Sequence, residues 1–180
     1  MKREGLIVML VVSTLVLFSS PAAALGELLE ELNPWDETRV GLVEGYLGAS
    51  NNQLDSVEES VPGTFGGVRR WVLEDFALGG EAEYLTRDGL TRDDSSEIDK
   101  LSVFGAAGTA TIMIEESINL IGSVGYYSKG EKSDIGYKAG LEAKLLGSDL
   151  SLVGRGSYRF LELDNDYSGL EIGGNLMLEF

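Results

Sequence analysis

The sequence predicts an all-β fold, an eight-stranded antiparallel up-and-down transmembrane β-barrel. Apolar and polar residues alternate with a period of two in segment after segment from residue 39 onward, which is typical of strands with one apolar and one polar face. The connections between these segments are alternately short and long. After residue 24, no apolar segment approaches the roughly 20 residues that a membrane-spanning helix needs. A mature chain of this kind that crosses a membrane must therefore do so as a closed barrel.

Residues 1–24 have the pattern of a secretory signal peptide. Lys2 and Arg3 precede an apolar stretch that begins at Leu6, and small residues end it with an Ala-x-Ala arrangement at Ala22 and Ala24. We expect cleavage after Ala24, an N-terminal periplasmic linker over residues 25–38, and the barrel over residues 39–180. An uncleaved membrane anchor is the alternative, which the short apolar run and the lack of a basic flank disfavour.

The composition excludes several classes of function. The 180-residue chain contains no Cys and no His, and its formal net charge is −16. An exported fold without Cys must be held by hydrogen bonds and packing. Without His, the usual proton shuttle and the commonest metal ligand are both missing, so the sequence predicts neither an enzyme nor a bound cofactor. So acidic a surface argues against binding to nucleic acid.

Alternation places eight strands, and the last of them keeps the pattern to its terminal Phe180. Two strands leave their facing open. Consecutive Arg69 and Arg70 turn one arginine outward in either register, and both faces of 101–114 are nearly apolar. The expected strands are about Arg39–Ala49, Phe65–Leu73, Phe76–Tyr84, Leu101–Ile114, Ile118–Tyr126, Ile135–Leu145, Leu150–Phe160 and Gly169–Phe180.

The connections sort by length, which is the asymmetry of up-and-down barrels in an outer membrane. Turns on the side of the two chain ends are short, and loops on the opposite side are longer. The short turns are Glu74-Asp75, Glu115-Glu116 and Gly147–Asp149, and the longer loops are Ser50–Pro62, Thr86–Asp99, Ser128–Asp134 and Leu161–Ser168.

Alternation by itself does not say which face points inward. Aromatic residues of the apolar face lie near the strand ends, as in the two interfacial belts of a lipid-facing barrel. These are Phe76 and Phe180 on the turn side, and Tyr84, Tyr126, Tyr137, Tyr158 and Phe160 on the loop side. The polar face carries charges of both signs, which a narrow eight-stranded interior needs because buried charges must pair. We therefore expect a lumen ion-pair network made of Glu44, Glu81, Glu83, Lys138, Glu142, Lys144, Arg155, Arg159 and Glu171.

Taken together, residues 39–180 resemble the small eight-stranded outer-membrane barrels of the OmpA and OmpX type. The resemblance rests on the leader, the opening strand GLVEGYLGAS (Gly41–Ser50), the turn and strand DFALGGEAEY (Asp75–Tyr84), and the ending GLEIGGNLMLEF. It implies a lumen closed by charges and a terminal Phe180 that serves as an insertion signal. The implied partners are outer-membrane lipid, lipopolysaccharide, periplasmic chaperones and the barrel-insertion machinery, with the chain as a monomer.

Two acidic loops raise the question of divalent cations. Residues 164–169 read Asp-Asn-Asp-Tyr-Ser-Gly, which matches the first half of a calcium loop, but the twelfth position is Asn175 instead of Glu. The second acidic group lies in the loop 86–99 and consists of Asp88, Asp93, Asp94, Glu97 and Asp99. Acidic loops are usually only solvated, so no metal site is predicted.

The sequence thus favours a non-enzymatic integral outer-membrane β-barrel with a structural or surface-interaction role. Two alternatives stay open. One is a soluble periplasmic, lipocalin-like carrier that turns its apolar face inward around an apolar ligand. The other is a narrow small-solute channel, which depends on whether the lumen charges leave a gap.

Overall fold

The computed structural model describes residues 39–91, 97–147, 150–161, 163 and 167–180. The predicted signal peptide (1–24) and linker (25–38) therefore lie outside the described residues. Within the described part, no helix is long and apolar enough to cross a membrane. The strands found there are β1 (Val43–Leu54), β2 (Val61–Trp71), β3 (Phe76–Thr91), β4 (Glu97–Glu115), β5 (Ile118–Lys129), β6 (Lys132–Leu146), β7 (Leu150–Phe160) and β8 (Gly169–Glu179).

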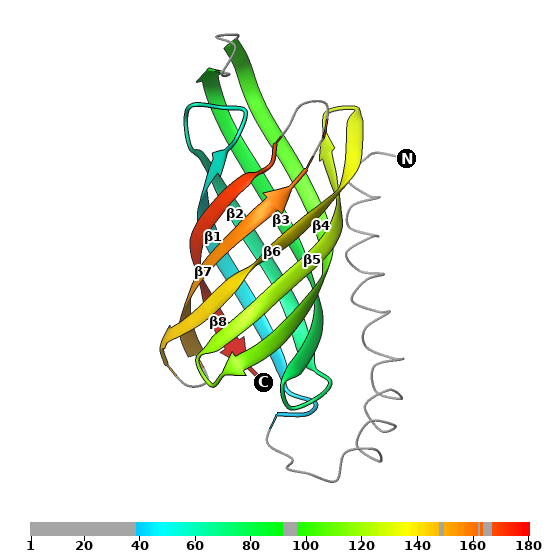
Figure 1. Cartoon of the computed structure of the whole chain (residues 1–180), viewed down its shortest axis with the longest axis vertical. Coiled ribbons are helices and arrows are strands. Elements are labelled where there is room, and N and C mark those ends of the chain that lie inside the picture. Colours follow the sequence, from blue (N-terminus) through cyan, green and yellow to red (C-terminus); the bar gives the residue numbers. More distant parts are fainter. Residues whose placement is uncertain (1–38, 92–96, 148–149, 162, 164–166) are drawn as a thin grey trace.

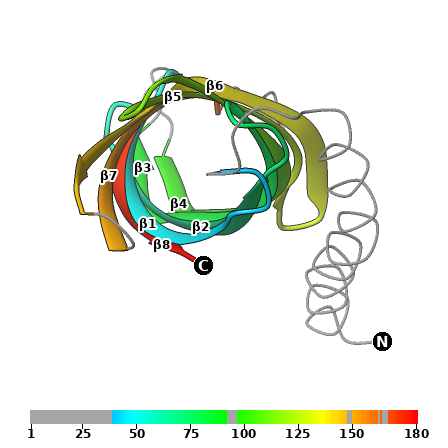
Figure 2. The same cartoon turned by 90° about the horizontal axis from the view of Figure 1, so that it is seen from below.

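These strands form one closed antiparallel barrel. Each strand pairs with the next along the chain, and β1 pairs with β8, so that the wall is continuous (Figures 1 and 2). At this seam the backbone N–H of Val43 donates to the carbonyl of Phe180 at 3.1 Å, and the N–H of Phe180 donates to the carbonyl of Val43 at 2.9 Å. Closure removes the unpaired edges that make an open sheet prone to aggregation. The predicted fold class is confirmed.

The strands are longer on the loop side than alternation indicated. β1 continues to Leu54, and the expected loop over 86–99 is mostly hairpin, because β3 runs to Thr91 and β4 begins at Glu97. The ladder between them continues to the pair Thr91↔Glu97, and this hairpin extends beyond the rest of the barrel (Figure 1). The alternation rule missed these residues because the outward positions there are polar, although the backbone pairing continues.

The two faces of the wall have opposite chemistry. Large apolar side chains point outward, as at Leu47, which is 72% exposed, whereas Arg159 on the inner face is 1% exposed. The facings that the sequence left open are now clear. In β4, Thr111 is buried and Ile112 is exposed, and in β2, Arg69 points inward and its neighbour outward. Charged and apolar residues both fill the interior, whereas the outer surface is mainly apolar.

Glycines on the inner face bring the strands into close contact, and Gly140 of β6 is an example. A Cβ at Gly140 would lie 2.3 Å from the carbonyl oxygen of Gly156, whereas a Cβ at outward-facing Gly156 would meet nothing within 4 Å. We expect Gly140→Ala to lower the free energy of unfolding by about 1–3 kcal/mol through overpacking. Gly156→Ala is the control and should cost less than Gly140→Ala. Denaturant midpoints of the detergent-solubilised barrel measure both, and equal midpoints would contradict the packing.

Candidate functional site

The interior of the barrel holds a band of buried charged side chains. Every second residue of a strand points inward, so each strand places its polar residues on the inner wall at regular intervals. The buried charged residues among those described are Glu44, Arg69, Glu81, Glu83, Lys138, Glu142, Arg155, Arg159 and Glu171. They form two groups, which we call the central network and the Arg69 group.

Lys138 of β6 lies at the centre of the central network. Its Nζ is 2.6 Å from Glu81 Oε1 and 2.7 Å from Glu83 Oε2, and both carboxylates come from β3 across the interior. A third carboxylate, Glu171 of β8, lies 3.5 Å away. One ammonium group is therefore shared among three carboxylates, and it has three N–H donors available for them.

Two arginines of β7 complete the central network. Arg155 and Arg159 are four residues apart on a strand and so share the inner face. Both terminal nitrogens of Arg155 donate to Glu81, one of them at 3.2 Å. Arg159 Nη2 lies between Glu83 Oε2 at 2.9 Å and Glu171 Oε2 at 3.0 Å. The central network thus joins three carboxylates to three cationic groups, so its formal charge is balanced.

Arg69 is the charged member of the Arg69 group that alternation left out, whereas Glu44 and Glu142 were expected in the lumen. Arg69 of β2 donates from Nε to Glu44 of β1, and its Nη1 is 2.6 Å from Glu142 Oε2 on β6 and 3.3 Å from Thr111 Oγ1 on β4. One guanidinium therefore ties together four strands. Arg69 shares its buried face of β2 with the aromatic residues Phe65 and Trp71. A rule that turns apolar faces towards lipid would have placed this face outside, and the two consecutive arginines left the parity open.

Lys144 lies apart from both groups. Its Nζ is 3.1 Å from Glu179 Oε1, and these side chains are 31% and 25% exposed, at the end of the barrel that carries the short turns. The pairing of β6 with β7 shifts register between Lys144 and Leu146, which interrupts strict alternation there. Sequence alternation grouped Lys144 with the lumen residues, but its partner is a rim carboxylate.

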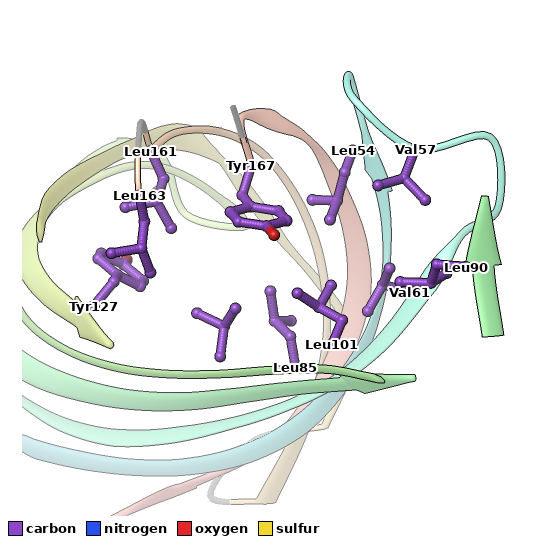
Figure 3. Close-up of a cluster of buried hydrophobic side chains, with 11 residues drawn as sticks. Leu54, Val57, Val61, Leu85, Leu90, Leu101, Tyr127, Leu161, Leu163 and Tyr167 are labelled. Carbon is purple, nitrogen blue, oxygen red and sulfur yellow. The ribbon is translucent and has the colours of Figure 1, made fainter. Parts of the chain in front are cut away.

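Above the charged band, towards the loops, the interior is filled by apolar side chains. We call this cluster the apolar cap (Figure 3). Its residues come from most of the strands and from the segments between β1 and β2 and between β7 and β8, and they point towards one another inside the wall. They are Leu54, Val57, Val61, Leu85, Leu90, Leu101, Val103, Tyr127, Leu161, Leu163 and Tyr167.

At the opposite end, Trp71 lies inside the wall with arginines beside its ring. The guanidinium carbon of Arg39 is 5.5 Å from the Trp71 ring centre, and that of Arg69 is 5.8 Å away. Both distances are within the range of cation–π attraction. Arg39 Nη1 also lies 2.9 Å from the sulfur of Met113. We call Trp71 and Arg39 the floor of the interior.

Loop segments at the cap end are held by polar contacts. The Thr91 backbone N–H donates to Glu59 Oε2 at 2.9 Å, and the Glu58 N–H donates to the Thr91 carbonyl at 3.1 Å. The hydrogen bond from the Thr91 N–H lowers the pKa of the Glu59 carboxyl below its ordinary value. Arg87 in turn donates to the Ser60 carbonyl. The segment between β1 and β2 is thereby attached to the β3–β4 hairpin.

Most of the acidic residues that raised the question of divalent cations lie outside the described residues. Residues 164–166 lie outside the described part of the chain, as do Asp93 and Asp94, and the side chains of Glu97 and Asp99. Among the residues that are described, no cluster of three or more acidic side chains is arranged to hold a metal ion. Phe180, the predicted insertion signal, is 67% exposed on the outer surface beside the seam.

The fold of this chain is similar to that of a solved outer-membrane protein, whereas its sequence matches no known family. No family model matches the sequence, and no curated protein matches it. Ail, the attachment invasion locus protein of Yersinia pestis, solved with the heparin analogue sucrose octasulfate, superposes with a TM-score of 0.57 at 17% identity, covering 78% of this chain and 99% of Ail. A second crystal structure of Ail gives a TM-score of 0.52 at 16% identity over the same shares.

This chain has the fold of a small outer-membrane β-barrel. Ail in a phospholipid bilayer nanodisc gives a TM-score of 0.51 at 17% identity, again covering 78% of this chain and 99% of Ail. The predicted resemblance to small eight-stranded outer-membrane barrels is thus confirmed at the level of the fold. At 16–17% identity the likeness concerns the fold alone.

Proposed function

We propose that the chain is a non-enzymatic integral outer-membrane β-barrel with a structural or surface-interaction role, whose lumen is closed by ion pairs. One observation carries the proposal: the inner face is charged and buried, whereas the outer face presents exposed leucines and isoleucines around the wall, including Leu47, Leu141, Leu152, Ile172 and Leu178. A continuous apolar surface of this kind is unstable in water and stable in hydrocarbon.

The height of the apolar surface fits a membrane. On β8, Leu170 pairs with Tyr158 of the loop-side belt, and Phe180 lies at the turn side ten residues later. At about 3.3 Å per residue and a strand tilt of about 40°, this distance corresponds to roughly 25 Å along the barrel axis. Outer-membrane barrels carry an apolar band of about that height.

Tyrosines mark the loop-side boundary of the band. Tyr84 and Tyr126 are exposed on the outer face. Their hydroxyls pair with Ser102, at 2.9 Å, and with Ser133. The hydroxyl of Tyr158 donates to Asp55 in the same way. An aromatic ring with its polar end directed to hydrophilic partners is favoured at a membrane–water interface.

The interior supports a closed lumen and a non-catalytic role. The central network spans from β3 to β6, β7 and β8, and the apolar cap and the floor lie at its two ends. Each buried carboxylate of the central network is engaged by a cationic side chain, so none of them is available as a general base. A lumen filled in this way supports a structural or scaffolding role, in which the loops are the part that is presented to the outside.

The apolar outer face also bears on the location and partners of the protein. We propose export with cleavage after Ala24, insertion directed by Phe180, and lipid and lipopolysaccharide as the surroundings of the monomer. Ail shares the fold and was solved with a heparin analogue. The net charge of −16 here opposes binding of a polysulfated ligand, so that property is not carried over. The protruding β3–β4 hairpin is the most extended surface that a partner could contact (Figure 1).

Heat-modifiable migration in detergent tests the proposal. A folded outer-membrane barrel resists unfolding in detergent until boiled, so the mature chain should run at two apparent sizes before and after heating. It should also sediment with outer-membrane vesicles. The soluble carrier hypothesis predicts the opposite result, a chain that stays in the aqueous periplasmic fraction, and that outcome would refute the proposal.

Planar bilayer recordings separate the closed barrel from the channel alternative. With the lumen filled by ion pairs, the apolar cap and the floor, we expect no current above baseline for the refolded chain. Discrete conductance steps that depend on the chain would favour the small-solute channel instead.

A further inference from the structure

Of the ten buried polar atoms that have no hydrogen-bond partner among the described residues, six belong to the central network or to its neighbours Tyr127 and Ser157. They are Glu83 Oε1, Tyr127 Oη, Arg159 Nε, Arg155 Nε, Ser157 Oγ and Glu171 Oε1. All belong to side chains that are at least nine-tenths buried. A buried polar group without a partner costs about 1–3 kcal/mol, so six such groups in one compartment require an explanation.

Three of these atoms belong to neighbouring side chains of β7 and β8. Ser157 sits between Arg155 and Arg159 along the inner face of β7, and it pairs directly across the ladder with Glu171. Arg155 Nε is 3.7 Å from Glu171 Oε1, which is too far for a direct hydrogen bond. Arg155 Nε, Ser157 Oγ and Glu171 Oε1 form the first site.

The side chains that carry the other three atoms lie around Gly105 of β4. Glu83, Gly105 and Tyr127 occupy one row across β3, β4 and β5. A Cβ at Gly105 would lie 2.5 Å from Tyr127 Cε1 and 3.0 Å from Glu83 Cγ, so both side chains extend over this glycine. The guanidinium carbon of Arg159 is 5.9 Å from the centre of the Tyr127 ring, and Arg159 Nη2 bonds to Glu83 at 2.9 Å. Glu83 Oε1, Tyr127 Oη and Arg159 Nε form the second site.

The two sites have the same chemistry. Each contains one guanidinium N–H that can only donate, one carboxylate oxygen that can only accept, and one hydroxyl that can do both. Because each site already has a positive and a negative group, a further ion of either sign is disfavoured. A small neutral molecule that donates and accepts hydrogen bonds satisfies all three atoms, and three bonds is the usual number for a buried water.

We propose that the lumen binds two structural water molecules, one at each site, enclosed between the apolar cap and the floor. These waters join the arginines of β7 to the carboxylates of β3 and β8 on the sides that the direct ion pairs leave unused. The waters thus help to connect opposite sides of the barrel wall. Their presence does not depend on where the protein is located in the cell.

Crystal structures of the wild-type barrel and of two conservative variants, at a resolution that places ordered waters, test this proposal. In the wild type we expect one density peak within about 3.2 Å of the three atoms of each site. Tyr127→Phe should weaken or remove the peak beside Glu83 and leave the peak beside Glu171. Ser157→Ala should do the reverse, so each variant is the control for the other.

Three outcomes would overturn the proposal. The first is no density at either site in the wild-type crystal. The second is a direct hydrogen bond from Arg155 or Arg159 Nε to its carboxylate. The third is a peak with the coordination distances of an ion. The wild-type crystal alone decides among these outcomes if a variant does not fold.

Discussion

Arg69→Leu should lower the free energy of unfolding of the barrel by about 3–5 kcal/mol, the usual effect of removing one partner from a buried ion pair. The substitution removes the only cationic group that directly contacts Glu44 and Glu142 among the described residues, and both carboxylates stay buried inside the wall. It also removes the contact with Thr111 and one of the two guanidinium groups beside Trp71.

Arg70→Leu is the matched control, one residue away in the same strand. Arg70 faces outward, where its ladder partners are Val43 and Leu78, and apolar replacement of an outward residue suits a lipid-facing surface. We expect a change of less than about 1 kcal/mol for this variant, as for most substitutions away from buried groups.

Denaturant titration followed by the detergent gel shift measures both variants without relying on Trp71 fluorescence, which loses a neighbouring guanidinium in Arg69→Leu. Equal effects of the two substitutions would contradict the facing of β2. A larger effect for Arg70→Leu would mean that Arg70, and not Arg69, points into the barrel.

Lys138→Met is expected to have a comparably large effect, again about 3–5 kcal/mol. Methionine keeps the length of the side chain but removes the charge that Glu81, Glu83 and Glu171 share. Lys144→Met is the control, because Lys144 lies on the same strand and has the same parity as Lys138. Its ion pair with Glu179 is partly exposed, so that its loss should cost about 1 kcal/mol or less.

A charge-matched double variant distinguishes electrostatics from packing. If Lys138→Met is destabilising because a carboxylate is left without sufficient counter-charge, then adding Glu83→Gln should restore part of the lost stability. The same gel-shift titration provides the free energies. No recovery in the double variant would mean that the Lys138 side chain acts through packing alone. Indistinguishable midpoints for Lys138→Met and Lys144→Met would contradict the central network.

The sequence was most informative where both faces of a strand are chemically distinct. Alternation in 135–145 put Lys138 and Glu142 on one face and Tyr137 and Leu141 on the other, and the structure buries the first pair and exposes the second. Where the contrast between the faces is weak, the rule failed. It could not orient β4, whose faces are nearly apolar, and it shortened β3 and β4 because the protruding hairpin is polar outside.

Alternation also could not reveal which charges meet. Arg69 was left out because its neighbour is another arginine, and Lys144 was grouped with the lumen although it pairs at the rim. The apolar cap was not anticipated at all. Its residues come from segments far apart in the chain, and several of them lie in regions that were expected to be loops.

Periodicity alone thus determined the strand class, the number of strands and the order of short and long connections, because a β-strand alternates its side chains whatever lies next to it. Only the tertiary structure decided the partners. The stagger between strands sets which inward residues reach the same level of the barrel. It places Lys138 beside Glu81, Glu83 and Glu171, and Arg69 beside Glu44 and Glu142. It also places the residues of the apolar cap together at one end.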